Sequence, residues 1–173
     1  MKSIYKIIIF ILSATTAFAQ HPVTYYFGFG KSISNKGSMH FALLHNELSL
    51  KINRSFSTSL DLQFARSYSG LLDRSEYIQG NWNIMVSPFK NEKKIFFRVG
   101  SGIFYNHTRN YFDPAIYPEY NKKVDIFRLS LFLEDEFKIS TKTVIALRLF
   151  TYPKFSTNET ISGALIKVGF RLS

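Results

Sequence analysis

Apolar and polar residues alternate with a period of two along most of this chain. The segments 48–52, 60–64 and 145–149 show the pattern most clearly, because a polar or small residue separates each apolar one from the next. Successive side chains of a β-strand point to opposite faces of the sheet, so each such segment builds one apolar and one polar face. The pattern predicts an all-β chain whose strands have two chemically different faces.

The start of the chain has the three parts of a secretory signal peptide. Basic residues come first, an apolar run covers residues 7–12, and small residues at Ala17 and Ala19 mark a cleavage site. A retained membrane anchor is the alternative, but the apolar run is shorter than the roughly 20 residues that a spanning helix needs. We expect a signal peptide at residues 1–19 and one mature domain at residues 20–173.

Candidate strands can be drawn through the whole mature chain, most of them near the roughly 9–11 residues that a tilted transmembrane strand needs. They cover residues 24–31, 41–52, 57–67, 77–87, 94–106, 124–139, 143–152 and 161–172. The gaps after the odd-numbered strands are long, and those after the even-numbered strands are short, as in barrels with long outer loops and short periplasmic turns. We therefore predict an eight-stranded antiparallel up-and-down transmembrane β-barrel in the cell outer membrane, with both termini in the periplasm.

Aromatic residues near the predicted strand ends favour a membrane barrel over a soluble one, because aromatic girdles lie at the headgroup level of membranes. The tyrosines expected next to the long gaps are Tyr68, Tyr77, Tyr105 and Tyr152, and the phenylalanines expected at the opposite rim are Phe56, Phe89 and Phe137. A soluble, lipocalin-like periplasmic binder is the alternative. It would have the apolar residues inside and the charges outside.

The last predicted strand ends Val168-Gly169-Phe170, with three residues after the aromatic one. On its alternation, length and ends, the mature chain resembles the small outer-membrane β-barrel family typified by OmpX and the membrane domain of OmpA. Members of that family usually end in an aromatic residue. This chain departs slightly from that pattern, because three residues follow Phe170. The resemblance implies a monomer that is inserted by the barrel assembly machinery and surrounded by outer-membrane lipids, including lipopolysaccharide.

Residues between the lipid-facing positions would face the interior, or lumen, of such a barrel. Eight strands enclose room only for side chains, and a buried charge needs a partner. The lumen charge network is expected to contain Glu47, Lys51, Asp61, Arg98, Arg128, Glu134, Arg148, Lys167 and Arg171. This network predicts a closed lumen, whereas a narrow passive pore beside the lumen glycines is the alternative. Those glycines, which would also leave space for long cationic side chains, are Gly28, Gly30, Gly100 and Gly102.

Neither metal nor nucleic-acid chemistry is indicated by the sequence. The chain has no cysteine, and an odd spacing puts His40 and His45 on opposite faces of one strand, which is poor geometry for a shared metal. We expect polar histidines at a rim instead. The net charge of +10 comes from cations scattered singly along the strands, so it does not indicate nucleic-acid binding. No cofactor is expected.

One enzymatic alternative is an acyl hydrolase that acts on lipid A. Such a barrel would need a His-x-Ser pair with a carboxylate that orients the histidine. Ser38 and His40 share a face but have no evident carboxylate, and in the segment that follows His107 the nucleophile's position is taken by Arg109. No catalytic residue is therefore assigned.

The longest predicted loop concentrates aromatic residues, a composition favoured in binding surfaces. The outer-loop contact residues are expected to be Tyr111, Phe112, Tyr117 and Tyr120. Arg66 and Arg109 lie near the outer rim, where guanidinium groups can pair with lipid phosphates. The sequence thus predicts a non-enzymatic protein that displays its outer loops for envelope integrity or for contact with lipopolysaccharide or another surface.

Overall fold

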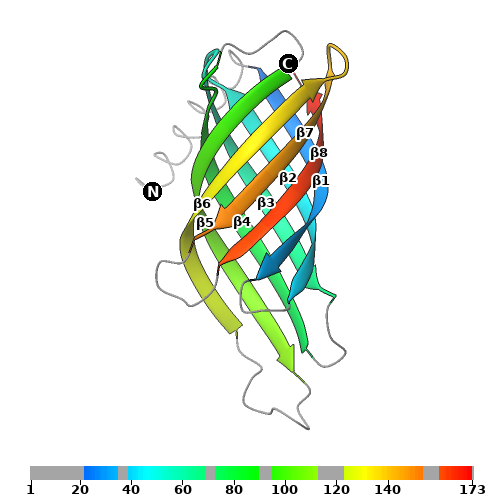
Figure 1. Cartoon of the computed structure of the whole chain (residues 1–173), viewed down its shortest axis with the longest axis vertical. Helices are drawn as coiled ribbons and strands as arrows, with labels where there is room; N and C mark the ends of the chain where they lie inside the picture. Colours follow the sequence, from blue (N-terminus) through cyan, green and yellow to red (C-terminus); the bar gives the residue numbers. More distant parts are fainter. Residues whose placement is uncertain are drawn as a thin grey trace, which may run out of the picture.

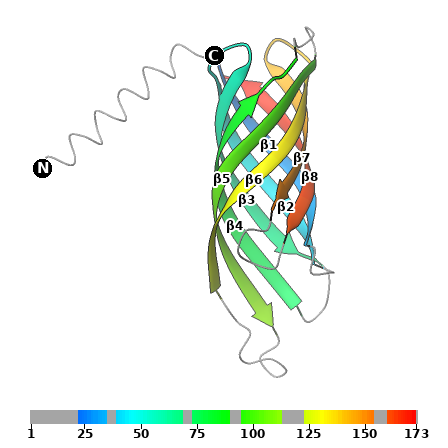
Figure 2. The ribbon, with the colours of Figure 1, turned by 60° about the vertical axis from the view of Figure 1, so that its left-hand side comes forward.

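The computed structural model describes residues 22–34, 39–68, 73–89, 95–112, 123–153 and 160–172. These residues form a closed antiparallel barrel in which each strand pairs with its neighbours in the chain and β1 pairs with β8 (Figures 1 and 2). The strands are β1 (Val23–Ser34), β2 (His40–Lys51), β3 (Phe56–Ser67), β4 (Asp73–Val86), β5 (Ile95–Phe112), β6 (Lys123–Lys138), β7 (Thr143–Tyr152) and β8 (Ile161–Arg171). The predicted eight-stranded up-and-down barrel is confirmed. No helix within these ranges has the length and hydropathy to cross a membrane.

One end of the barrel, here called the turn end, carries the start of β1, the end of β8 and the three connections at residues 52–55, 87–94 and 139–142. The other end is called the loop end. Short polar side chains close two of the turns: Asn53 Oδ1 accepts hydrogen bonds from the backbone N–H groups of Ser55 and Phe56, and Ser140 Oγ accepts one from Thr143. Such local bonds are the reason that Asn and Ser favour turns.

The lengths of the connections alternate less regularly than the sequence predicts. The loop-end connections at residues 35–39 and 68–72 have five residues each, whereas the turn-end connection at residues 87–94 has eight. The difference arises because strands extend into segments expected to be loops. β5 continues to Phe112, where it pairs with Asp73 of β4, and it projects beyond most of the barrel at the loop end (Figure 1).

This extension corrects part of the predicted outer-loop surface. Tyr111 and Phe112 lie in β5 and not in a loop, because β4 continues to pair with this segment as far as Asp73. Tyr117 and Tyr120 lie outside the described residues, as does the predicted signal peptide at residues 1–19.

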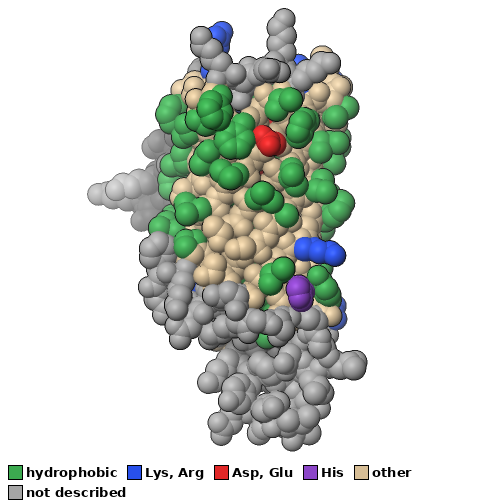
Figure 3. Space-filling model, viewed as in Figure 1, with side chains coloured by type: hydrophobic (Ala, Val, Ile, Leu, Met, Phe, Trp, Pro, Cys, Tyr) green, Lys and Arg blue, Asp and Glu red, His purple; other side chains and the backbone are tan. Residues whose placement is uncertain are grey.

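The outside of the barrel is apolar. Large hydrophobic side chains are exposed on every strand, for example Leu60 on β3, Ile84 on β4 and Leu149 on β7. They cover much of the face seen in Figure 3, which shows few charged side chains. This arrangement is the reverse of a soluble barrel, which would place its apolar residues inside. It suits a barrel surrounded by lipid.

The two predicted aromatic rims are only partly correct. Phe56, Phe89 and Phe137 are exposed near the turn end, and Tyr68 is exposed at a loop-end strand terminus, as expected. Tyr105 also faces outward, but it lies inside β5, opposite Gly80 of β4, and not at a rim. Tyr77 and Tyr152, however, are buried in the lumen. Tyr77 alternates with Gln79 on the inward face of β4, and the side-chain period of a strand fixes its direction whatever its polarity.

An apolar cluster fills part of the lumen, a feature that the sequence interpretation did not include. Its buried members are Phe41, Leu43, Ala65, Tyr77, Met85, Phe104, Phe132, Phe150, Tyr152 and Leu165. The aromatic rings of Phe104 and Tyr152 are 4.5 Å apart between centroids. The lumen is therefore filled by aromatic as well as by charged side chains.

Glycines on the lumen face make room for two kinds of neighbour. A Cβ added to Gly28 would lie 2.9 Å from Cγ of Lys167, so this glycine leaves space for a cationic side chain, which comes from the neighbouring strand β8. A Cβ at Gly100 would instead collide with the ring of Phe132. Here the space is used by an aromatic residue and not by a cation from across the barrel.

Candidate functional site

Two cations and two carboxylates meet in the middle of the lumen. Lys167 Nζ lies 2.7 Å from Oε2 of Glu47 and 2.5 Å from Oε2 of Glu134. Arg148 bridges the same two carboxylates, with Nη2 3.0 Å from Glu47 and Nε 2.6 Å from Glu134. All four side chains are buried, and they come from β2, β6, β7 and β8. We call these four residues the central network.

Aromatic rings lie against the cations of the central network. The guanidinium carbon of Arg148 is 4.1 Å from the ring centroid of Phe132, and Nζ of Lys167 is 4.5 Å from that of Tyr26. A cation over a ring face is attracted by the ring quadrupole, more strongly where water is excluded. These rings fill the space beside the ion pairs, so the cross-section here is occupied by side chains.

The ion pairs continue from the central network towards the turn end. Arg98 Nη2 is 2.7 Å from Oε1 of Glu134 and also pairs with Glu136. The hydroxyl of Tyr26 donates a hydrogen bond to Glu136, and Arg171 approaches the same carboxylate at 3.8 Å. Glu136 therefore already has several partners within the barrel.

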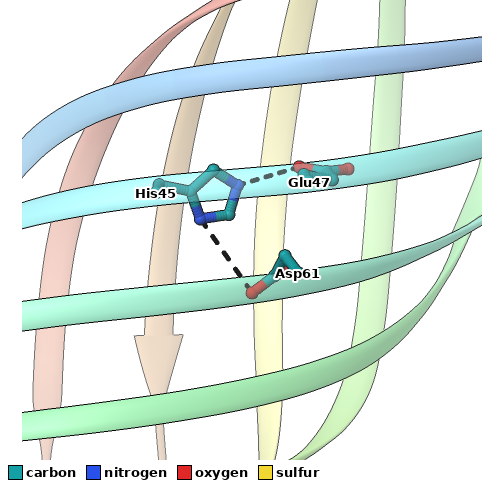
Figure 4. A group of neighbouring side chains, drawn as sticks. All are labelled: His45, Glu47 and Asp61. Atoms are coloured by element: carbon teal, nitrogen blue, oxygen red, sulfur yellow. Dashed lines mark hydrogen bonds and ion pairs between the residues drawn. The ribbon is translucent and has the colours of Figure 1, made fainter.

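His45 is fully buried beside the central network, so its predicted position at a rim is wrong. Its Nε2 lies 3.0 Å from Oε2 of Glu47, and its Nδ1 lies 3.9 Å from Oδ1 of Asp61 (Figure 4). The three side chains have the donor types and proximity of a metal site. However, Arg148 and Lys167 contact the same carboxylates and would repel a metal cation, so we interpret the cluster as a hydrogen-bonded imidazole.

The residues predicted for the lumen charge network are divided among three levels of the barrel. Ion pairs join Glu47, Asp61, Arg98, Glu134, Arg148 and Lys167. Lys51 and Arg171, which also approaches Glu136, line a cavity at the turn end together with Arg98. Arg128 lines a cavity of about 150 Å³ with Phe41, Tyr77 and Phe104. Sequence reasoning missed His45 and Tyr26. His45 shares a strand face with Glu47 two positions away, which was the available signal.

A row of charged side chains lies on the outward face near the loop end. Cross-strand pairing places Arg66 opposite Glu76, Glu76 opposite Arg109 and Arg109 opposite Lys123, on β3 to β6. Lys31 on β1 lies in line with these residues, because the same residue of β2 pairs with Lys31 on one side and with Arg66 on the other. These five residues are called the outward basic row. Its four cations exceed its one carboxylate, and the ion pair of Arg66 with Glu76 is long at 3.6 Å and exposed.

A second outward cluster lies two positions further along β5 and β6, towards the middle of the barrel. His107 Nδ1 is 2.7 Å from Oδ1 of Asp125, and the hydroxyl of Tyr105 donates to the same oxygen at 2.7 Å. Asp125 supplies the orienting carboxylate that the sequence did not reveal. Thr108 donates to the side chain of Asn106, at 2.5 Å, and is not bonded to His107.

Comparison with solved structures shows the fold of small outer-membrane barrels. Neisserial surface protein A superposes with a TM-score of 0.65 at 11% identity, covering 88% of this chain and 97% of that one. The Yersinia pestis attachment invasion locus protein Ail gives 0.57 at 8% identity, with 88% and 97% covered. The N-terminal barrel domain of Pseudomonas aeruginosa OprF gives 0.56 at 7% identity, with 85% and 97% covered. No protein-family model and no curated protein sequence matches the chain.

Replacing Arg148 with Met should destabilise the barrel, because it leaves Glu47 and Glu134 with one fewer cation in a buried site. We expect a loss of about 3–5 kcal/mol in the free energy of unfolding. Urea titration in lipid vesicles can follow the fluorescence of Trp82, the only tryptophan of the chain, which faces outward.

The matched control is Arg66→Met, which removes the same charge from an exposed pair. We expect this variant to lose less than about 1 kcal/mol. Equal losses in the two variants would contradict the energetic importance of the central network.

Proposed function

We propose that this outer-membrane barrel is a non-enzymatic envelope protein, closed to ions, whose outward basic row binds the phosphates of lipopolysaccharide. The observation that carries the proposal is the row itself, in which Lys31, Arg66, Arg109 and Lys123 share one register on the outside of the barrel. The proposal includes periplasmic termini, since the row then lies at the outer leaflet, where lipopolysaccharide is found.

The chemistry of the row suits phosphorylated lipid. A guanidinium group can bind a phosphate with two parallel hydrogen bonds. Neighbouring strands are about 4.8 Å apart, so Arg66 and Arg109, two strands apart, are separated by about 10 Å and can contact different oxygens of one headgroup. The intervening Glu76 competes weakly for Arg66, because an exposed ion pair of 3.6 Å contributes little.

The filled lumen supports a role without transport. Arg148 and Lys167 cross the interior to reach both Glu47 and Glu134, and aromatic rings occupy the space around them. An ion that passed this level would have to break buried ion pairs, at a cost of several kcal/mol. A narrow passive pore is therefore the less favoured function.

A closed lumen predicts little or no ion conductance from the purified protein in planar bilayers. The double variant Arg148→Ala with Lys167→Ala removes both bridging side chains, and we expect it to show short, intermittent currents if it folds. Circular dichroism checks that the barrel is retained. A large, stable conductance from the unaltered protein would contradict the proposal.

Binding of lipopolysaccharide should be weakened by replacing Arg66 and Arg109 with Gln, because two charge-assisted hydrogen-bonding groups are lost. We expect affinity to fall at least about tenfold. The fluorescence of Trp82 measures binding as lipopolysaccharide is titrated into protein held in nonionic detergent. Lys142→Gln, at the turn end, is the matched control and should bind normally. Unchanged affinity in the double variant would refute the row as the binding surface.

The oriented imidazole of His107 favours a second candidate, an acyl hydrolase that acts on lipid A. Its base would be His107, held by Asp125 on the outward face, and the earlier pair of Ser38 and His40 is the other possibility. Neither set is complete in the described residues: Ser38 lies outside them, and the two residues after His107 are Thr108 and Arg109. A barrel that only binds lipid is therefore the preferred proposal.

Mass analysis of lipid A separates the two candidates. Cells with and without the protein should contain the same acylated species if the barrel only binds lipid A. An acyl-chain difference that disappears in Ser38→Ala or in His107→Asn would establish the enzyme instead, and the affected variant would identify which pair acts.

A further inference from the structure

A cavity of about 180 Å³ opens at the turn end of the lumen. Strands β1, β2, β3, β5, β6 and β8 and the turn between β2 and β3 contribute to it. Its charged lining residues are Lys51, Arg54, Arg98, Glu136, Lys138 and Arg171. Hydroxyl groups, among them those of Thr24 and Ser57, complete a polar lining. We call this space the mouth cavity.

The mouth cavity has a surplus of positive charge, with five cations against the single carboxylate of Glu136. That carboxylate is already bound by Arg98, by the hydroxyl of Tyr26 and, at 3.8 Å, by Arg171. Among the described residues, no ion pair within 4.0 Å joins Lys51, Arg54 or Lys138 to a carboxylate. The surplus is therefore not neutralised by the described part of the barrel.

Two side chains in the cavity have donors that remain available. The Nε atom of Arg98 is buried and has no hydrogen-bond partner in the described part of the chain. The ammonium group of Lys51 lies 5.1 Å from the ring centroid of Phe96, which holds it at the cavity without using its hydrogen-bond donors. Burying a donor such as Arg98 Nε without a partner is costly, and an anion in the cavity would offset that cost.

The central network provides the contrast. There, Arg148 and Lys167 each contact both Glu47 and Glu134, so the cations are paired within the protein. One water occupies about 30 Å³ in the liquid. The mouth cavity, at about 180 Å³, therefore has room for a group larger than a few waters. Arg98 and Glu136 line the cavity, and Arg98 also pairs with Glu134 of the central network, so ion-paired side chains lie between the cavity and that network.

We propose that the mouth cavity is a binding site for a phosphate-type oxyanion, either a free phosphate compound or the phosphate of a lipid headgroup at the turn-end membrane surface. Lys51 and Arg54 contact the anion from β2 and its turn, and Lys138 and Arg171 from β6 and β8. Nothing in this proposal depends on the outward basic row, which lies at the other end of the barrel.

Isothermal titration of the mature protein in nonionic detergent tests the site. Inorganic phosphate should bind saturably at one site, and the double variant Lys51→Gln with Arg54→Gln should bind at least about tenfold more weakly, because two charge-assisted contacts are lost. Both side chains are exposed, so the variant should fold. The matched control Lys142→Gln removes a charge from the same end but outside the cavity lining, and should bind normally.

A second arm titrates short-chain phosphatidate. Phosphatidate that competes with inorganic phosphate and binds more tightly identifies a lipid headgroup as the source, whereas binding of inorganic phosphate alone identifies a soluble one. Absence of saturable binding by both compounds overturns the proposal. Equal weakening in the double variant and in Lys142→Gln also overturns it, because attraction would then be due to the overall charge of this end.

Discussion

The cross-lumen ion pairs join strands that the chain otherwise connects only through their neighbours. Lys167 on β8 and Glu47 on β2 are separated by 120 residues, and Arg148 reaches the same carboxylate from β7. The backbone ladder closes the barrel, but it does not determine what fills the interior. Because the interior excludes most water, each charge there needs a partner from the opposite side.

Above and below the central network the lumen has a different composition. Towards the loop end, Phe104, Phe150 and Tyr152 pack in an apolar cluster, where burial of rings replaces charge pairing. Towards the turn end, the mouth cavity retains unpaired cations such as Lys51. The described lumen therefore changes along its axis from a mainly aromatic region that also holds Arg128, through paired charges, to a positive cavity. In the sequence, the inward-facing positions follow a single alternation pattern, although their side chains lie in three different environments.

The period-two alternation predicted most of the fold, and it was more reliable than residue type. Tyr77 and Tyr152 were expected in the lipid-facing girdle because aromatic residues gather at rims. Both lie on the inward face, as their positions relative to Gln79 and Arg148 require. The position of an inward-facing side chain along the barrel axis could not be predicted, because it depends on strand tilt and cross-strand register. Arg128 has the inward direction expected of a network residue but lies at another level.

Many of the cations that appear scattered in the sequence form three groups in the described part of the barrel. Cations of the central network are neutralised by buried carboxylates, mainly those of Glu47 and Glu134. The outward basic row and the mouth cavity keep their surplus because water or an external anion can reach them. Desolvation thus decides which cations are structural and which remain available to ligands. The surplus at the two ends of the barrel is separated by a neutral and filled centre, so the two ends can bind anions independently of each other.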